Sequence, residues 1–145
     1  MSNTSKYESD FHAWANEQAA LLRQGRLAEA DMENIAEEIE GLGRSEKREL
    51  VNRLAVLLTH LLKWQFQPGL RGNSWRGTIR EQRRKLSEHL DDNPSLRAGL
   101  NDAIARAYKD ALGTVQNETG LAEATFPATS PYTPAQIFEA AFLPE

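Results

Sequence analysis

Apolar residues recur every three to four positions along most of the chain, which is the spacing of an amphipathic helix. The clearest stretch lies between residues 45 and 68, where large aliphatic residues follow this period: Leu50, Val51, Leu54, Leu57, Leu58, Leu61 and Leu62. An apolar face this wide is typical of a helix at the centre of a bundle. Pro68 and Gly69 predict its end, because proline disfavours helical geometry in the residue before it.

The same spacing predicts helices on both sides of this stretch. One begins near Phe11 and ends at Gly25, since glycine adopts the left-handed C-terminal conformation without a Cβ clash. Another starts at Asp31, with acidic residues near its N-terminal dipole. Further helices follow Asn73 and Pro94, and the second of these runs towards Gly120.

Two glycines leave the length of one helix open. Gly41 and Gly43 lie within the stretch from Asp31 to Pro68. Each glycine costs about 1 kcal/mol relative to alanine inside a helix. The pattern is therefore compatible with one long helix or with two helices broken at Gly41–Gly43.

The two ends of the chain differ from its middle. Residues 121–145 are rich in proline and aromatic residues, which predicts an extended strap followed by a short helix with Thr133 as its cap and Pro134 at its first position. Residues 1–8 are expected to form an N-terminal tail. Because strand-like alternation is absent, the sequence predicts an all-α fold: an up-and-down bundle of four to five helices in a single domain, 1–145.

Composition agrees with one globular domain and limits its chemistry. The chain has 145 residues, of which 40% are hydrophobic and 26% charged, so it is long enough to bury its own core. It contains no cysteine, which excludes disulfides and thiolate metal sites. The first residues lack the apolar run of a signal peptide, and no stretch approaches the roughly 20 apolar residues of a membrane span. We expect a cytoplasmic protein that does not enter a membrane.

Charge is partitioned along the chain. Residues 1–40 carry 3 basic and 9 acidic residues, residues 41–90 carry 11 and 4, and residues 91–145 carry 3 and 8. Clustered lysine and arginine raise the local potential and favour an anionic partner. The basic middle could equally neutralise the protein's own acidic helices.

The segment His60–Lys85 concentrates the basic and aromatic residues. It suggests a nucleic-acid or anion-binding face, in which cations contact phosphates and aromatic rings stack on bases. The candidate binding residues are His60, Lys63, Trp64, Arg71, Ser74, Trp75, Arg76, Arg80, Gln82 and Arg83. Arg76, Arg80 and Arg83 are expected on the outer face of their helix, opposite the apolar one. The alternative is that the tryptophans pack at the core edge and the arginines are solvated or paired.

One pair of residues suggests catalysis. An arginine followed after about four to six residues by a histidine resembles the active-site pattern of the small helical ribonucleases built on HEPN domains. Arg53 and His60, at positions i and i+7, fit this pattern. Arginine would clamp a scissile phosphate, and histidine would act as general acid or base without a metal. The structural alternatives are an ion pair between Arg53 and Glu49 and a half-buried His60 beside the leucines.

Signatures of metal and nucleotide chemistry are missing from the sequence. The glutamates at 33, 37, 38 and 40 are accompanied by no Glu-x-x-His motif, which di-iron bundles require. The glycines match neither a P-loop nor a dinucleotide fingerprint, and no serine lies in a nucleophile elbow. We therefore expect no metal and no cofactor.

Several short motifs together resemble a known family. They are Trp14, Glu37-Glu38-Ile39-Glu40, His60-Leu-Leu-Lys63-Trp64, Gln67-Pro68, Ser74-Trp75, Gln82-Arg83, Pro94-Ser95-Leu96, Phe126-Pro127, Pro131-Tyr132 and Phe142-Leu143-Pro144. In this combination the chain resembles the bacterial family called domain of unknown function 29. The resemblance implies an all-helical bacterial protein, and it supplies no catalytic residues.

Three functions follow from these observations. We favour a non-enzymatic helical protein that contacts a protein partner or a second copy of itself. The first alternative is a nucleic-acid or anion binder that uses His60–Lys85. The second is the metal-independent ribonuclease that uses Arg53 and His60.

Overall fold

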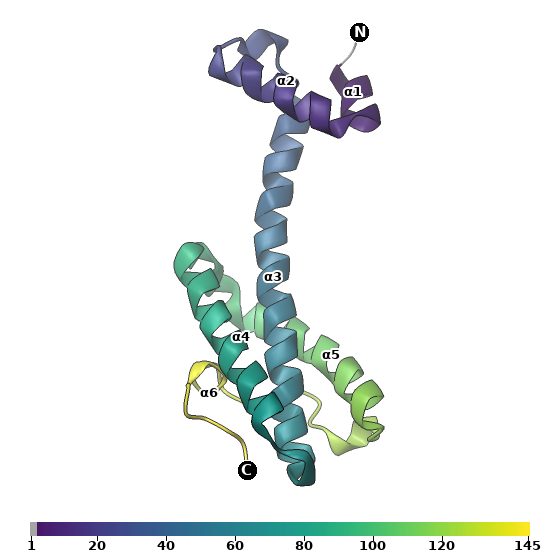
Figure 1. The fold of residues 1–145 in the computed structure, drawn as a ribbon, viewed down its shortest axis with the longest axis vertical. Coiled ribbons are helices and arrows are strands. Elements are labelled where there is room, and N and C mark those ends of the chain that lie inside the picture. Colours follow the sequence, from purple (N-terminus) through teal and green to yellow (C-terminus); the bar gives the residue numbers. More distant parts are fainter. Residues whose placement is uncertain (1–2) are drawn as a thin grey trace. The chain divides into compact units, whose positions relative to one another are not determined.

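The computed structural model describes residues 3–145, and within that range it is helical and contains no strand. The α-helices are α1 (Asn3–Ser9), α2 (Phe11–Arg23), α3 (Met32–Phe66), α4 (Asn73–Asp92), α5 (Leu100–Thr119) and α6 (Pro134–Phe138) (Figure 1). Short 3-10 turns lie at Leu27–Glu29, Pro68–Leu70, Pro94–Gly99 and Glu123–Thr125. The all-α prediction is confirmed.

The chain forms two compact units. We call Met1–Ser45 the N-terminal unit and Glu46–Glu145 the C-terminal unit. The boundary between them falls inside α3. A single domain over 1–145 stays a prediction.

Helix α3 is one continuous helix, which answers the question that its glycines raised. Neither Gly41 nor Gly43 has a positive φ, so neither takes the left-handed conformation that ends a helix. Around them, Arg44 forms ion pairs with Glu37 at 3.2 Å and Glu40 at 4.0 Å. Exposed pairs of this kind contribute only a few tenths of a kcal/mol, but they favour the helical geometry.

The N-terminal unit contains a helix that the sequence did not predict. Residues 3–8 were expected to belong to a tail but form most of α1, whereas residues 1–2 lie outside the described range. The Tyr7 ring packs edge-on against Trp14, with ring centres 4.6 Å apart, and its hydroxyl donates to Glu38. These contacts explain the error, because a seven-residue helix depends on packing rather than on its own propensity.

Asp31 organises the start of α3 within the same unit. Its carboxylate accepts from the Trp14 indole at 3.0 Å and from the Asn34 amide group at 2.8 Å. Its main-chain N–H donates to the Gln18 side chain at 2.7 Å. The Asn34 and Trp14 hydrogen bonds lower the pKa of Asp31, against an opposing effect of burial.

The C-terminal unit holds the leucine core. All seven aliphatic residues predicted on α3 are buried, and they pack with Ile79, Leu86 and Leu90 of α4 and with the apolar face of α5. Full burial of each such side chain stabilises the fold by about 1.5–3 kcal/mol. Two cross-contacts fix the direction of α4: His89 lies against Glu46, and Gln82 against Arg53. The later residue of α4 contacts the earlier residue of α3, and the earlier residue of α4 contacts the later residue of α3. Helices α3 and α4 are therefore antiparallel (Figure 1).

The C-terminal strap covers the end of this core. The Tyr108 hydroxyl donates to the Pro127 carbonyl at 2.7 Å, and the Tyr132 hydroxyl donates to the Gln65 side chain at 2.7 Å. Thr133 caps α6 by accepting from the Gln136 N–H, and the Gln136 side chain accepts from the Thr133 N–H. This reciprocal capping box confirms the predicted short helix.

Candidate functional site

The turn between α3 and α4 places two arginines on one tryptophan. The guanidinium carbons of Arg71 and Arg76 lie 5.2 and 4.9 Å from the centre of the Trp64 ring. Arg71 also donates to the Trp64 carbonyl at 2.7 Å. Trp64 is only 5% exposed, so its ring is not available to stack on a base. Both arginines act as cations over an aromatic face and hold the turn.

Lys63 connects α3 to α5 rather than facing solvent. Its ammonium group forms an ion pair with Glu118, and its side chain is 11% exposed. The same ammonium group lies 6.0 Å from the Trp75 ring, which is half-buried. Lys63 therefore has a carboxylate partner within the protein itself.

His60 lies one turn before Lys63 and is half-buried. Its Nδ1 donates to the Val56 carbonyl at 2.8 Å. Burial lowers the pKa of His60, and the nearby charge of Lys63 lowers it further, whereas the Val56 carbonyl and Glu118 oppose the shift. The neutral imidazole is favoured, and its Nε2 remains the basic nitrogen.

Arg53 contacts other residues than His60. It donates to Glu49 at 3.4 Å and to the Gln82 side chain at 3.5 Å. Glu49 lies one turn before Arg53 on α3, and Gln82 lies on α4. Seven residues of helix separate Arg53 from His60 by about 10 Å along the axis. Among the described residues, no hydrogen bond joins the two. The paired clamp and base of the ribonuclease hypothesis are not in contact.

Arg83 corrects the prediction of an outer basic stripe. It is 6% exposed, and its guanidinium donates to the carbonyls of Ile137 at 2.8 Å, Gln136 at 3.2 Å and Ala140 at 3.3 Å. Burial lowers its pKa, and the charge of Glu139 opposes this. The helical period could not show the error, because the C-terminal segment covers this side of α4 and supplies carbonyls that need donors.

The other basic residues of α4 do not converge, and Arg76, Arg80 and Arg84 are exposed. Arg84 pairs with Glu81 at 2.7 Å and Glu88 at 2.6 Å, and Lys85 lies 3.5 Å from Glu81. Arg76 donates to the Asn73 side chain at 3.4 Å. Arg80 is exposed and has no hydrogen-bond or ion-pair partner among residues 3–145. Ser74 is exposed at the start of α4, where its carbonyl accepts from Thr78.

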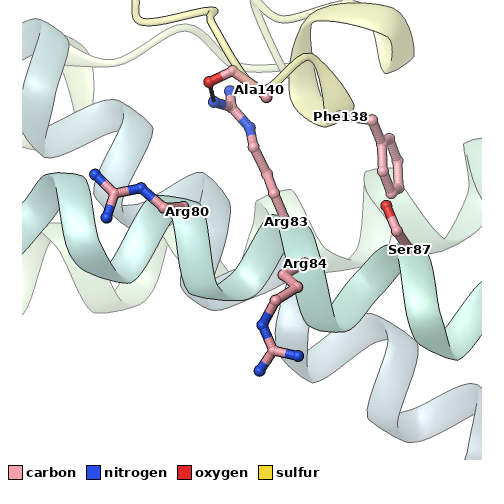
Figure 2. A pocket seen from close by; sticks show the side chains of 6 residues that line it. All are labelled: Arg80, Arg83, Arg84, Ser87, Phe138 and Ala140. Atoms are coloured by element: carbon pink, nitrogen blue, oxygen red, sulfur yellow. Dashed lines mark hydrogen bonds between the residues drawn. The ribbon is translucent and has the colours of Figure 1, made fainter.

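A shallow pocket of about 310 Å³ lies beside Arg83, lined by Arg80, Arg83, Arg84, Ser87, Phe138 and Ala140. Figure 2 shows that the three guanidinium groups point in different directions, with that of Arg83 turned towards the Ala140 carbonyl. An anion in this pocket would therefore not meet a converging set of cations. The pocket has no built anion site.

His89 is a buried polar residue that the sequence did not single out. It is 6% exposed, and its Nε2 lies 2.8 Å from the Glu46 carbonyl while its Nδ1 lies 3.0 Å from the Glu49 carboxylate. These contacts join α4 to α3. Its position three residues after Leu86 was the available signal, since i and i+3 share a helix face.

The N-terminal unit exposes most of its large apolar side chains. Within the described part of this unit, Trp14 is the one buried large apolar residue. The exposed ones are Phe11 (48%), Leu22 (39%), Leu27 (54%), Met32 (50%), Ile39 (62%) and Leu42 (68%). Among the described residues of the C-terminal unit, the exposed large apolar side chains are those of Val56 and Leu70. Exposed apolar surface is concentrated at 11–42, outside the basic segment.

Two further findings concern residues 3–145. No helix within 3–145 is long and apolar enough to cross a bilayer. No three His, Cys, Asp or Glu side chains within that range lie close enough together to hold a metal ion.

The sequence matches the family described as Domain of unknown function DUF29 over residues 6–143. The chain belongs to this DUF29 family. The match covers nearly the whole DUF29 chain and confirms the resemblance carried by the motifs around His60–Arg83. No curated protein and no solved structure matches the chain.

Proposed function

We propose that this DUF29 protein is a non-enzymatic helical protein that binds a protein partner through its N-terminal unit. One observation carries the proposal: within the described part of that unit, one large apolar side chain is buried and six are exposed. Large exposed apolar patches are rare on monomeric proteins and mark interaction sites, and three of the six residues, Met32, Ile39 and Leu42, share one face of α3 at helical spacing. Burial of these side chains against a partner supplies the free energy of association.

The basic segment His60–Lys85 supports the same proposal, because most of its cations already contact acceptors within the protein. Lys63, Arg83 and Arg84 each bind an acceptor of the chain itself. Arg71 donates to the Trp64 carbonyl. Removing these groups from their partners to contact an external phosphate would cost the hydrogen bonds that now satisfy them. We infer that most of this segment serves the fold.

Purification of the tagged, full-length chain from its own cells tests the proposal, with sedimentation velocity as the readout. The expected result is a complex with a second protein in fixed stoichiometry, or an assembly of the chain with itself. A lone monomer to which no protein binds would contradict the proposal.

A second candidate function is the binding of a nucleic acid or another polyanion. Arg76 and Arg80 support it, because both are exposed and neither has a carboxylate partner among the described residues. The ribonuclease reading stays a prediction, supported by the basic Nε2 of His60 alone. Equal RNA cleavage by wild type and His60→Ala, or cleavage by neither, would end it.

A further inference from the structure

A stripe of uncovered apolar residues runs along the first part of α3. It consists of Met32, Ile39 and Leu42, which are 50%, 62% and 68% exposed. At about 100° per residue, the three lie within about 80° of the helix circumference and span about 15 Å of its length. This is the size of the face that an amphipathic helix of a few turns presents. We refer to these three residues as the α3 stripe.

Carboxylates lie on both sides of the α3 stripe. At helical spacing, Glu38 lies beside Leu42, and Glu33 and Glu40 lie on the other side. Glu40 is 70% exposed and has only a 4.0 Å contact with Arg44, and Glu33 is exposed. The unit as a whole carries 9 acidic and 4 basic residues. The surroundings of the stripe are therefore strongly negative.

This charge distinguishes between the occupants that an apolar stripe can take. A second copy of the chain would bring the same carboxylates against these ones, and like charges across an interface oppose association. A helix with lysine or arginine beside its apolar face would place opposite charges at both edges. Charge complementarity therefore favours a basic helix of another protein over a second copy of the chain.

We propose that the α3 stripe docks an amphipathic, basic helix of another protein. This inference rests on the proposed interaction function and names the surface and the chemistry of the partner. The apolar side chains of that helix would cover Met32, Ile39 and Leu42. Its lysines or arginines would pair with Glu33 and Glu40 at one edge, and at the other edge they would lie near the negative charge of Glu38, which accepts from the Tyr7 hydroxyl.

A labelled helical peptide tests the proposal with the full-length chain. The peptide has about 18 residues of leucine and lysine with the leucines on one face, a length at which a helix can persist. Two comparison peptides have the same lysine content without an apolar face, or glutamate in place of lysine. Fluorescence anisotropy should show binding of the first peptide at least about tenfold tighter than binding of either comparison peptide.

Matched variants locate the binding. Ile39→Ser with Leu42→Ser should weaken binding by at least about tenfold, because both side chains are exposed and their loss removes apolar contact area. Leu70→Ser, at a site 64% exposed in the C-terminal unit, should leave the affinity unchanged. Glu33→Lys with Glu40→Lys should weaken binding, and Glu123→Lys, exposed in the C-terminal unit, should not.

Three outcomes would overturn the inference. One is equal affinity for the peptide that lacks an apolar face, and another is full binding by the Ile39→Ser, Leu42→Ser variant. The third is a wild-type dimer that this variant converts to a monomer, which would make a second copy the occupant while the proposed function stands. If the wild-type chain instead purified as a lone monomer that binds no protein, the proposed function would fail together with this inference.

Discussion

The Arg83 Nε donates to the Ile137 carbonyl oxygen at 2.8 Å, so a buried cation of α4 holds the last helix of the chain. The same guanidinium reaches two further carbonyls of that segment. Arg83 therefore stabilises the position of α6 by satisfying acceptors that the helix end leaves open. The family motif around Gln82-Arg83 has a structural role.

The first prediction concerns this contact. Arg83→Met should lower the free energy of unfolding by about 3 kcal/mol, because three carbonyls lose a charged donor in a buried setting. Arg84→Met is the matched control: Arg84 is 55% exposed, and loss of its pairs with Glu81 and Glu88 should cost less than about 1 kcal/mol. Urea unfolding measures both. Equal midpoints for Arg83→Met and wild type would contradict this role.

The second prediction concerns the start of α3. Asp31→Ala should speed amide hydrogen exchange across 32–38, because the helix loses an acceptor that binds the Trp14 indole and the Asn34 side chain. Exchange in the C-terminal unit should be unchanged. Mass spectrometry of peptides from both units measures this. Protection at 32–38 equal to that of wild type would show that Asp31 is dispensable.

Acid should act on the same residue. The folded-state pKa of Asp31 is lowered below its ordinary value of 3.8, so its contribution to stability is complete above 3.8 and is lost as pH falls through the lower folded value. We expect the exchange rates of wild type and Asp31→Ala at 32–38, corrected for intrinsic rates, to converge in that acidic range. A difference between them that persisted undiminished would contradict the shift.

The third prediction concerns His60. Its folded-state pKa lies below 6.5, so the unfolded chain binds the proton more readily and stability falls as pH decreases from 6.5 towards the folded value. His60→Asn should remove this part of the pH dependence, since its amide can still donate towards the Val56 carbonyl. Urea unfolding of both proteins over about pH 5 to 7.5 isolates His60 from the other histidines. Parallel curves would contradict the shift.

The fold was predictable where a residue's environment follows from helical spacing. The leucines of α3 from Leu50 to Leu62 all lie in the core, and Thr133 with Gln136 forms the cap that Thr133 and Pro134 indicated. Arg83 shows the limit of such reasoning, because spacing identifies the faces of a helix but not what distant segments cover them. The binding role of His60–Lys85 depended on free cations, and cross-helix partners such as Glu118 lie too far along the chain to be recognised.

The fourth prediction concerns nucleic acid. RNA binding by the wild-type chain should be weak, and Arg76→Ser with Arg80→Ser should change the affinity by less than about threefold. The reason is that few cations of the basic segment are free to neutralise phosphates and so release counterions from the RNA. A filter-binding titration between about 50 and 200 mM salt measures this. Tight binding that fell steeply with salt and was lost in the double variant would favour the polyanion reading instead.

The central claim is that the partner surface lies on the α3 stripe and not on the basic face of α4. A photo-crosslinking amino acid placed at position 39 or, in a second protein, at position 80 tests it in living cells; both side chains are exposed, so neither replacement disturbs the core. We predict that position 39 yields a crosslinked protein of defined mass and that position 80 yields none above background. A crosslink at position 80 without one at position 39 would contradict the account.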